Sequence, residues 1–303
     1  MPALDARPGL SSARRDLLGI MSSPIQAIAE YGRRLEQEAR DKDAVSRGGA
    51  ALLDVDRAHW KSGQLADRIA SGLAIVRVAL SRCREPVIAF SGGKDSICTM
   101  ALVHTVDPMV PVLWSDDELE YPEVVSYMRC LAICAMPVSE PEFLWLQGGS
   151  VHGGWFRPWV DKPFFREPDR RMIWREPHQG DSQDWLRDQG YDLTFLGTRM
   201  GESRRRRDHL LVSHSQGPVQ AVKRGTGQHC TPIWDWTEAE VWALIGGWNL
   251  PYPVVYDRLA ELRVERHRQR VGPLPLARRE DLASGWPDLI TALEARYGSH
   301  WLT

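Results

Sequence analysis

The stretch that decides the fold runs from Pro86 to Val106 and reads PVIAFSGGKDSICTMALVHTV. Its first five residues form an apolar run without helical period, which predicts a strand. The next six, SGGKDS (Ser91 to Ser96), form a Gly-rich turn, and the remainder has the pattern of a helix. Strand, Gly-rich turn and helix in this order indicate the opening of a βαβ unit.

Further apolar runs follow along the chain: VPVLW (Val110 to Trp114), FLWL (Phe143 to Leu146) and LTFLG (Leu193 to Gly197). Strands that alternate with helices predict an α/β fold, a doubly wound and mainly parallel sheet with helices on both faces. The long segment between the last two runs, about Gln147 to Gly190, is rich in Gly, Pro, Trp and Arg. A loop of that length in a compact domain favours a functional role such as a substrate lid.

Helical patterns flank this unit. The first 84 residues have apolar positions at helical spacing, in one stripe at Ile25, Ile28, Tyr31 and Leu35 and in a second within a predicted helix over 62–82. Near the other end, Thr237 with Glu240 three residues later forms a capping-box pattern, which predicts the start of a helix. The sequence therefore predicts a helical N-terminal extension (1–84), a central α/β domain that contains the SGGKDS turn (85–257) and an Arg-rich C-terminal segment (258–303).

The turn SGGKDS has the chemistry of an anion site. Gly92 and Gly93 allow a sharp turn and a close approach of backbone N–H groups to an anion, and the dipole of the helix that follows favours negative charge. Lys94 adds a formal charge, while Ser91 and Ser96 add hydroxyl donors. This combination suits a phosphate or pyrophosphate, although its spacing matches neither GxxxxGK[ST] nor GxGxxG.

Three more characteristic stretches follow SGGKDS along the chain. They are SDDELEYPEVVSYM (Ser115 to Met128), LGTRMGESRRRR (Leu196 to Arg207), and TPIWDWTEAEVWALI followed by NLPYPVVYD (Thr231 to Asp257). With SGGKDS, they make the chain resemble the PP-loop ATP pyrophosphatases of adenine nucleotide alpha-hydrolase-like fold, and within them the phosphoadenosine phosphosulfate (PAPS) reductase family. That branch also includes the ATP sulfurylase small subunit and the sulfur-transfer proteins of DNA phosphorothioation. The resemblance covers about Pro86 to Asp257. The family signature G-x-R-x-x-E-S-x-x-R is met by Gly197, Arg199, Glu202, Ser203 and Arg206.

The resemblance implies a site for ATP or an adenosine phosphosulfate, with SGGKDS on the phosphates and Gly197, Arg199, Glu202 and Ser203 also at the nucleotide. Cleavage between the α and β phosphates needs cations on the departing pyrophosphate, and Lys94, Arg199 and Arg206 can supply them.

The acidic residues leave alternatives open. Asp95, grouped with these catalytic candidates, either orients the loop or holds Mg²⁺ with the phosphates, or is a helix-terminal carboxylate stabilised by the dipole. The acidic residues after the second predicted strand either touch ribose or metal or form a solvated loop: Asp116, Asp117, Glu118 and Glu120.

The cysteines separate this chain from the reductases it resembles. Those enzymes use a Cys in an ECGxH-like tail, and related proteins hold a [4Fe–4S] cluster on four Cys. Here the tail ARYGSHWLT contains no Cys, and Cys83, Cys98, Cys130, Cys134 and Cys230 form no such quartet, so no iron–sulfur cluster is expected. Buried apolar thiols are the favoured interpretation. For Cys230, in a polar Gly-containing stretch beside His229, a reactive thiol or sulfur carrier is the alternative.

Composition limits the remaining possibilities. Lys and Arg total 38 against 40 Asp and Glu, a net charge of −2, which argues against a globally basic nucleic-acid binder. Local basic stretches lie at 204–207 and in the tail, at Arg258, Arg263, Arg266, Arg268, Arg270, Arg278 and Arg279. These either meet DNA, RNA or a phosphate-bearing substrate, or pair on the surface with Glu261, Glu265 and Glu280. No apolar run of about 18 residues occurs, so we expect no membrane span and a reduced, cytoplasmic protein.

These inferences favour an ATP pyrophosphatase that uses ATP and Mg²⁺ to form an adenylated intermediate for sulfur transfer, of which DNA phosphorothioation is an example. Expected partners are an adenine nucleotide, a sulfur donor resembling a cysteine desulfurase, and nucleic acid as an optional acceptor. Two alternatives remain: a sulfonucleotide (PAPS) reductase or sulfate adenylyltransferase-like subunit, and a nucleotide-binding assembly subunit without turnover.

Overall fold

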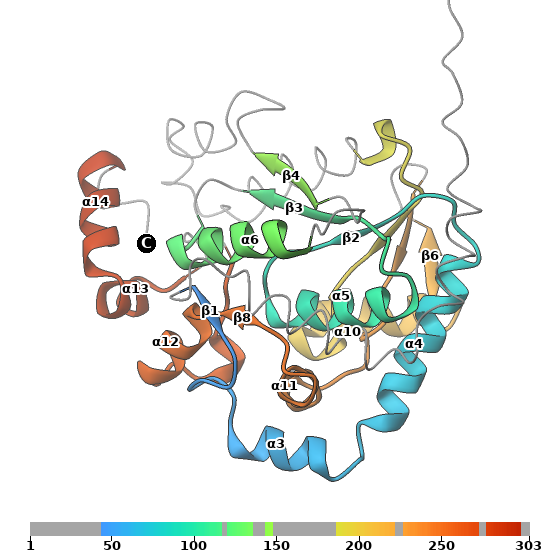
Figure 1. The fold of residues 1–303 in the computed structure, drawn as a ribbon, viewed down its shortest axis with the longest axis horizontal. Helices are drawn as coiled ribbons and strands as arrows, with labels where there is room; N and C mark the ends of the chain where they lie inside the picture. Colours follow the sequence, from blue (N-terminus) through green and yellow to red (C-terminus); the bar gives the residue numbers. More distant parts are fainter. Residues whose placement is uncertain are drawn as a thin grey trace, which may run out of the picture.

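A mixed six-stranded sheet forms the centre of the molecule (Figure 1). The computed structural model describes residues 44–116, 120–135, 143–147, 186–221, 227–272 and 277–297. Within these ranges the strand order is β4-β3-β2-β5-β7-β6, where the strands are β2 (Pro86–Ala89), β3 (Val112–Asp116), β4 (Phe143–Gln147), β5 (Leu193–Phe195), β6 (Val219–Ala221) and β7 (Gln228–Cys230). All neighbours are parallel except β6, which pairs antiparallel with β7. The predicted doubly wound α/β fold is confirmed.

The direction of winding reverses at β2. From β2 the chain moves through β3 to β4 on one side, and later returns to place β5 against the other side of β2. Ligand sites in open α/β sheets form at such a switch point, outside the carboxyl ends of the strands. The turn SGGKDS follows β2 at this edge, and Gly197 follows β5, so the topology brings the two motifs together.

The two faces of the sheet bury different side chains, as the period of two in a strand requires. Ile88 and Val112 belong to the main hydrophobic core together with residues of α5 (Lys94–Val106) and α6 (Pro122–Ala135). Val87 and Leu113 point to the opposite face, where they form a small cluster with Leu186.

The other described helices extend this core: α3 (Asp54–Lys61), α4 (Ala66–Leu80), α10 (Arg204–His214), α11 (Glu238–Gly247), α12 (Val255–Glu261), α13 (Arg279–Gly285) and α14 (Pro287–Tyr297), with 3-10 turns at Met200–Glu202 and Arg266–Arg268. The predicted capping box is present, because Thr237 Oγ1 accepts from the Glu240 N–H at 3.2 Å. The helix predicted from residue 62 begins at Ala66 instead. Gly63 has a φ of +75°, a left-handed conformation that separates α3 from α4.

The described residues of the predicted N-terminal extension and of the Arg-rich C-terminal segment share one hydrophobic core with the central domain. Ala51, Leu65 and Val76 lie in the same buried cluster as Leu282 and Trp286. A short antiparallel pair joins β1 (Val45–Ser46) to β8 (Tyr252–Pro253). The boundary predicted at 257 falls inside α12. The division into three segments therefore stays a prediction about sequence organisation, while packing runs across it.

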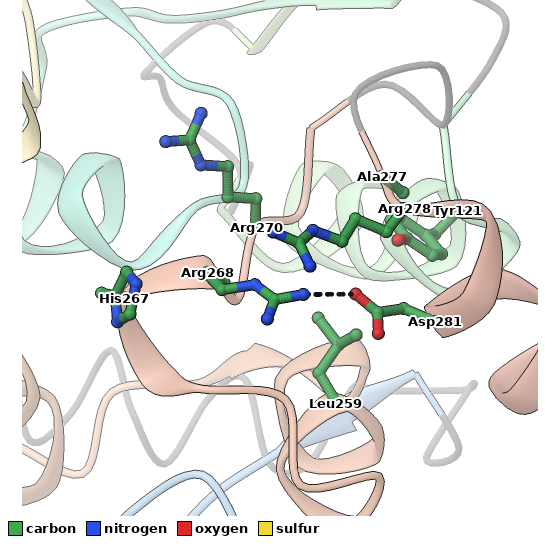
Figure 2. A pocket seen from close by; sticks show the side chains of 8 residues that line it. All are labelled: Tyr121, Leu259, His267, Arg268, Arg270, Ala277, Arg278 and Asp281. Carbon is green, nitrogen blue, oxygen red and sulfur yellow. Dashed lines mark ion pairs between the residues drawn. The ribbon is translucent and has the colours of Figure 1, made fainter. Parts of the chain in front are cut away.

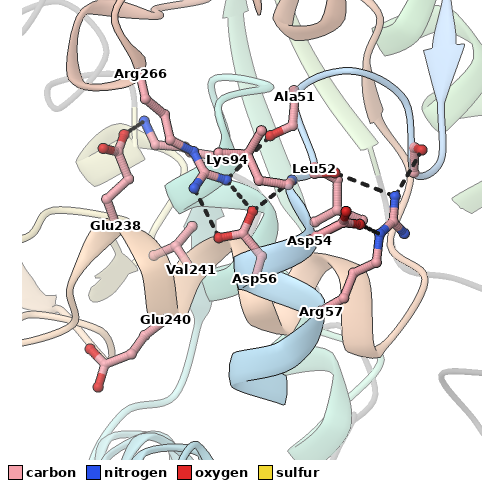
Figure 3. A network of polar contacts seen from close by, with 12 residues as sticks. Ala51, Leu52, Asp54, Asp56, Arg57, Lys94, Glu238, Glu240, Val241 and Arg266 are labelled. Atoms are coloured by element: carbon pink, nitrogen blue, oxygen red, sulfur yellow. Dashed lines mark hydrogen bonds and ion pairs between the residues drawn. The ribbon is translucent and has the colours of Figure 1, made fainter. Parts of the chain in front are cut away.

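A buried ion pair fastens α3 to the tail (Figure 3). The guanidinium of Arg266 donates to Asp56 Oδ1 at 2.8 Å and to Asp56 Oδ2 at 2.5 Å, and also to the Ala51 carbonyl at 3.2 Å. The Asp56 side chain has no exposed area, and Arg266 stacks over the Trp242 ring at 5.1 Å. Of the Glu residues expected to pair with the tail arginines, none is the partner of Arg258, Arg266, Arg268 or Arg279; their partners are Glu123, Asp56, Asp281 and Glu294.

Several predictions fall outside the described residues. These are the helix near Ile25, the acidic positions Asp117 and Glu118, the side chains of Asp116 and Cys134, and most of the segment 147–190. Among the helices that are described, none has both the length and the apolar composition needed to span a lipid bilayer.

We predict that Asp56→Ala lowers the free energy of unfolding by about 3 kcal/mol, because it leaves the largely buried Arg266 charge without its carboxylate. Urea unfolding measures the loss. Asp54→Ala is the control on the same helix: Asp54 is fully exposed and lies 3.7 Å from Arg57, a pair whose removal costs less than about 1 kcal/mol. Equal losses in the two variants would contradict the assignment of Asp56.

Candidate active site

The PP-loop (Ser91–Ser96) makes the turn between β2 and α5. Gly92 has a φ of +71°, which favours glycine, and a Cβ at this position would lie 2.7 Å from Met128 Cε on α6. Gly93 is the N-cap residue of α5, so the first turn of that helix starts inside the motif. The predicted geometry of strand, Gly-rich turn and helix N-terminus is present.

The loop satisfies part of its own hydrogen-bonding capacity. Ser96 Oγ donates to the Gly93 carbonyl at 2.8 Å, and the Gly93 N–H donates to Ser91 Oγ at 3.4 Å. The Lys94 N–H donates to the Tyr256 hydroxyl at 3.0 Å. These two N–H groups are therefore engaged inside the protein. The two serines shape the loop, in addition to any role toward an anion.

Gly197 holds the end of β5 against the PP-loop. A Cβ built on Gly197 would lie 2.7 Å from the Asp95 carbonyl carbon and 2.7 Å from the Ser96 nitrogen. Atoms of a real side chain do not approach backbone this closely, so the contact requires glycine. Gly197 thus contributes close packing of backbone on backbone at the switch point.

Arg199 links the same two motifs through charge. Its Nε donates to Asp95 Oδ1 at 2.6 Å, and its Nη1 donates to the Trp236 carbonyl at 3.2 Å. Only 5% of Arg199 is exposed. This arrangement favours the interpretation in which Asp95 orients the loop, because its carboxylate is already held by a buried guanidinium.

Lys94 is buried among acidic groups (Figure 3). Its Nζ lies 3.4 Å from Glu238 Oε1 and 3.7 Å from Asp95 Oδ2, and 5.8 Å from the centre of the Tyr256 ring. Burial by itself lowers the pKa of the ammonium, but Tyr256, Asp95 and Glu238 outweigh burial and raise the pKa above its ordinary value. Lys94 therefore carries its charge at neutral pH. Contact between Lys94 and a phosphate stays a prediction.

The remaining signature residues build the turn into α10. Glu202 Oε1 accepts from the Arg199 N–H at 3.0 Å, and its carboxylate also pairs with Arg206. Ser203 is the N-cap of α10, with Oγ accepting from the Arg206 N–H at 3.2 Å. The Arg206 side chain is half exposed. Glu202 and Ser203 thus have structural partners, and their contact with a nucleotide is untested.

Three groups at the site were absent from the sequence-based candidates. These are Glu238, Tyr256 and the Trp236 carbonyl. The signals were present, since the capping box places Glu238 in the first turn of α11 and the motif L-P-x-x-x-x-Y ends at Tyr256. Neither pattern indicates that Glu238 or Tyr256 contacts Lys94, because Lys94 lies far away in the sequence.

The acidic motif around Tyr121 anchors the tail. Glu123 Oε1 accepts from Arg258 Nη1 at 2.6 Å and from Trp286 Nε1 at 2.8 Å. The Tyr121 ring packs against Trp286 at a tilt of 55°, with ring centres 4.7 Å apart. Within the described part, this motif therefore binds α12 and the residues before α14.

Three of the described thiols confirm the interpretation as buried apolar groups. Cys98, Cys130 and Cys230 are buried, and Cys83 is half buried. Cys230 is fully enclosed in the main core, and burial raises the pKa of its thiol far above the ordinary value. A thiolate at Cys230 is therefore strongly disfavoured at neutral pH, which argues against the sulfur-carrier alternative.

Comparison of the sequence with models of protein families gives a match. A family model described as the phosphoadenosine phosphosulfate reductase domain matches residues 85–136 and 166–272, more than half of the chain. No curated protein sequence matches.

Solved structures with related folds are distant. PAPS reductase from Candida auris, as a phosphate complex, is 15% identical with a TM-score of 0.49, and the match covers 67% of this chain and 88% of that one. FMN adenylyltransferase of Candida glabrata with FAD and inorganic pyrophosphate is 12% identical with a TM-score of 0.40, covering 73% of this chain and 65% of that one. The U34-tRNA thiolase NcsA of Methanococcus maripaludis, with its [4Fe-4S] cluster, is 14% identical with a TM-score of 0.39, covering 77% and 75%.

We predict that Gly197→Ala destabilises the protein by about 2 kcal/mol, because the new methyl group must displace the backbone at Asp95 and Ser96. Urea unfolding measures this loss. Gly201→Ala is the matched control two residues beyond Arg199, where a Cβ would meet only Arg199 Nη1 at 3.7 Å. The close contact at Gly197 is refuted if both variants unfold at the wild-type midpoint.

Proposed function

The chain belongs to the phosphoadenosine phosphosulfate reductase domain family, and on this premise we propose that it is an ATP pyrophosphatase that adenylates an acceptor for sulfur transfer. Members of the family act on adenine nucleotides in sulfur metabolism. The acceptor we favour is one into which sulfur is then inserted, such as a phosphate of a nucleic-acid backbone.

One observation carries the proposal: the PP-loop lies at the switch point with Gly197 packed on it and Arg199 bonded to its aspartate. Apart from the Lys94 N–H, which donates to Tyr256, the N–H groups in the first turn of α5 have no acceptor within the helix and lie at the positive end of its dipole. This geometry favours binding of the nucleotide phosphates at the loop. Arg199 and Lys94 add two buried charges beside the loop, where low solvent exposure strengthens their field.

The proposed step balances without electron transfer. An oxygen of the acceptor attacks the α-phosphorus of ATP, the bond from that phosphorus to the α,β-bridging oxygen breaks, and pyrophosphate leaves with the electron pair. In a later step, which unlike adenylation consumes two electrons, a persulfide on a partner resembling a cysteine desulfurase would attack the acceptor and displace AMP, and a thiol reductant would cleave the resulting S–S bond to leave the sulfur on the acceptor. The task of the chain's own residues is to fix the triphosphate and to stabilise charge on the departing pyrophosphate.

In this scheme Mg²⁺ is bound by the nucleotide phosphates and not by a resident protein site. Among the described residues, no group of three or more His, Cys, Asp or Glu side chains is placed to hold a metal ion. One Asp95 oxygen is bonded to Arg199, and the other lies 3.7 Å from the Lys94 ammonium. Mg²⁺ usually binds nucleotide phosphates with few protein ligands. A resident metal site thus does not fit these residues, and Mg²⁺ would arrive with ATP.

We predict that the protein releases pyrophosphate and AMP from ATP and Mg²⁺ when acceptor and sulfur donor are present, and that Lys94→Ala lowers the rate 10- to 100-fold. The magnitude corresponds to the loss of about 1.5–3 kcal/mol from a charge-assisted interaction. Chromatography of the nucleotide products measures it, with sulfate and DNA tested in turn. Lys61→Ala, at an exposed lysine on α3, is the control and keeps the wild-type rate.

Two other results would replace the proposal. ATP that binds but stays intact with every acceptor and donor selects the subunit without turnover. Sulfite released from PAPS with a thiol reductant present selects the reductase. Thermal unfolding of Lys94→Ala must show a folded protein, because this lysine also neutralises Asp95 and Glu238.

We predict that Cys230→Ala leaves the rate of nucleotide cleavage unchanged and lowers stability by about 1 kcal/mol, the cost of a small cavity in the core. The same assay and urea unfolding measure the two effects, with the half-buried Cys83→Ala as control. A loss of activity confined to Cys230→Ala would restore Cys230 as a reactive thiol.

A further inference from the structure

Figure 2 shows a pocket at the tail in which half of the eight lining residues are arginine or histidine. Its volume is about 340 Å³, enough for a small ligand group. His267, Arg268, Arg270 and Arg278 contribute the cationic side, and Tyr121 and Asp281 complete the polar lining. The lining residues include three arginines and one aspartate, an excess of two positive charges before His267 is counted.

The pairing of the tail arginines shows where this excess lies. Arg258, Arg266 and Arg279 each have a carboxylate partner outside the pocket lining, and Arg268 lies 3.7 Å from Asp281. Within the described residues, Arg270 and Arg278 have no such ion pair, and both are exposed. Figure 2 shows the guanidinium group of Arg278 near that of Arg268, which is directed to Asp281, and the guanidinium group of Arg270 apart from both. Like charges held in this way favour an anion between them.

The pocket is connected to the PP-loop by short stretches of chain. Val271 follows Arg270 directly, and its Cγ2 would lie 3.7 Å from a Cβ built on Gly93. Leu259 lines the pocket one turn after Tyr256, whose hydroxyl accepts from the Lys94 N–H. An anion in the pocket would therefore be positioned near the nucleotide phosphates.

We propose that this pocket binds a tetrahedral oxyanion of the acceptor, a phosphate or sulfate group, and presents it to the PP-loop. Arg270 and Arg278 supply positive charge that no carboxylate neutralises among the described residues. The ion pair of Arg268 with Asp281 and the hydroxyphenyl group of the buried Tyr121 also line the pocket. Guanidinium groups bind such oxyanions through paired N–H donors. The identity of the ligand as acceptor rests on the proposed function. The binding of the oxyanion itself does not.

The test is therefore a binding measurement with no turnover. Inorganic sulfate, inorganic phosphate and a short DNA duplex are titrated separately into the full chain without ATP. We expect Arg278→Gln and Arg270→Gln each to weaken binding of the bound probe about tenfold, as expected for loss of one charge-assisted contact. Arg279→Gln is the matched control, because Arg279 neighbours Arg278, is exposed and pairs with Glu294 outside the pocket lining.

The outcomes separate the sources of the oxyanion. Weakened binding of sulfate or phosphate supports a free anion as ligand. Weakened binding of DNA alone, with a salt dependence reduced by about one ion per arginine, supports a backbone phosphate. The proposal is overturned if no probe binds, or if the two pocket variants behave like Arg279→Gln. Arg278→Lys, which keeps the charge, should restore most of the affinity.

Failure of the pocket and failure of the proposed function give different results. Both pocket variants should still bind the nucleotide, because neither arginine forms a hydrogen bond or ion pair with a described residue of the PP-loop. If the oxyanion binds but ATP is never cleaved, the pocket stands and the adenylation proposal falls. If ATP is cleaved at the wild-type rate by both variants with the acceptor present, the pocket does not serve the acceptor.

Discussion

The ion pair between Arg199 and Asp95 is the interaction on which the site depends. Its partners come from the ends of two adjacent parallel strands and lie 104 residues apart in the sequence. Arg199 is buried, and removal of a largely buried charge from water is offset only when the geometry is good and the other donors are also used. Here a second donor reaches the Trp236 carbonyl, and the backbone of Gly197 approaches without a side chain in the way. The loop, the end of β5 and the start of α11 are thus fixed relative to one another.

A continuous set of aromatic and cationic contacts extends from this site to the front of the described chain. Lys94 lies over Tyr256, the Tyr256 ring meets Trp242 edge to face at 5.2 Å, and Trp242 carries Arg266 on its face. Arg266 in turn holds Asp56 of α3. Each of the ring contacts alone contributes little, and together with the Arg266–Asp56 pair they connect the site to α3.

The sequence predicted what depends on local pattern and failed where distant residues meet. The strands at Pro86 and Leu193 and the helix after Thr237 follow from apolar period and capping chemistry, and the family motifs ordered them correctly. The burial of Lys94 by Glu238 did not follow, because a first-turn glutamate reads as a helix-dipole residue whichever charge lies opposite. Glu123 was likewise hidden in an acidic run whose partners, Arg258 and Trp286, lie in the tail. For the tail arginines, the sequence suggested nearby glutamates as ion-pair partners, whereas the folded chain pairs them with carboxylates from other elements. At Cys230 the polar-looking context left a reactive thiol open as an alternative. Only the pairing with Phe195 on the neighbouring strand shows that the thiol lies in the core.

The position of Tyr256 has a consequence for how the protein responds to ligands. Its hydroxyl accepts from the Lys94 N–H in the first turn of α5, and the next residue, Asp257, accepts from the Ala51 N–H and the Tyr252 hydroxyl. A ligand that rigidifies the PP-loop therefore also restrains α12 and, through it, the segment before α3. By linkage, opening of that segment must weaken ligand binding at the loop by the same free energy with which the bound ligand stabilises the segment. The hydrogen bonds through Tyr256 and Asp257 thus connect the segment before α3 to the loop, and ligand binding at the loop should slow hydrogen exchange in that segment.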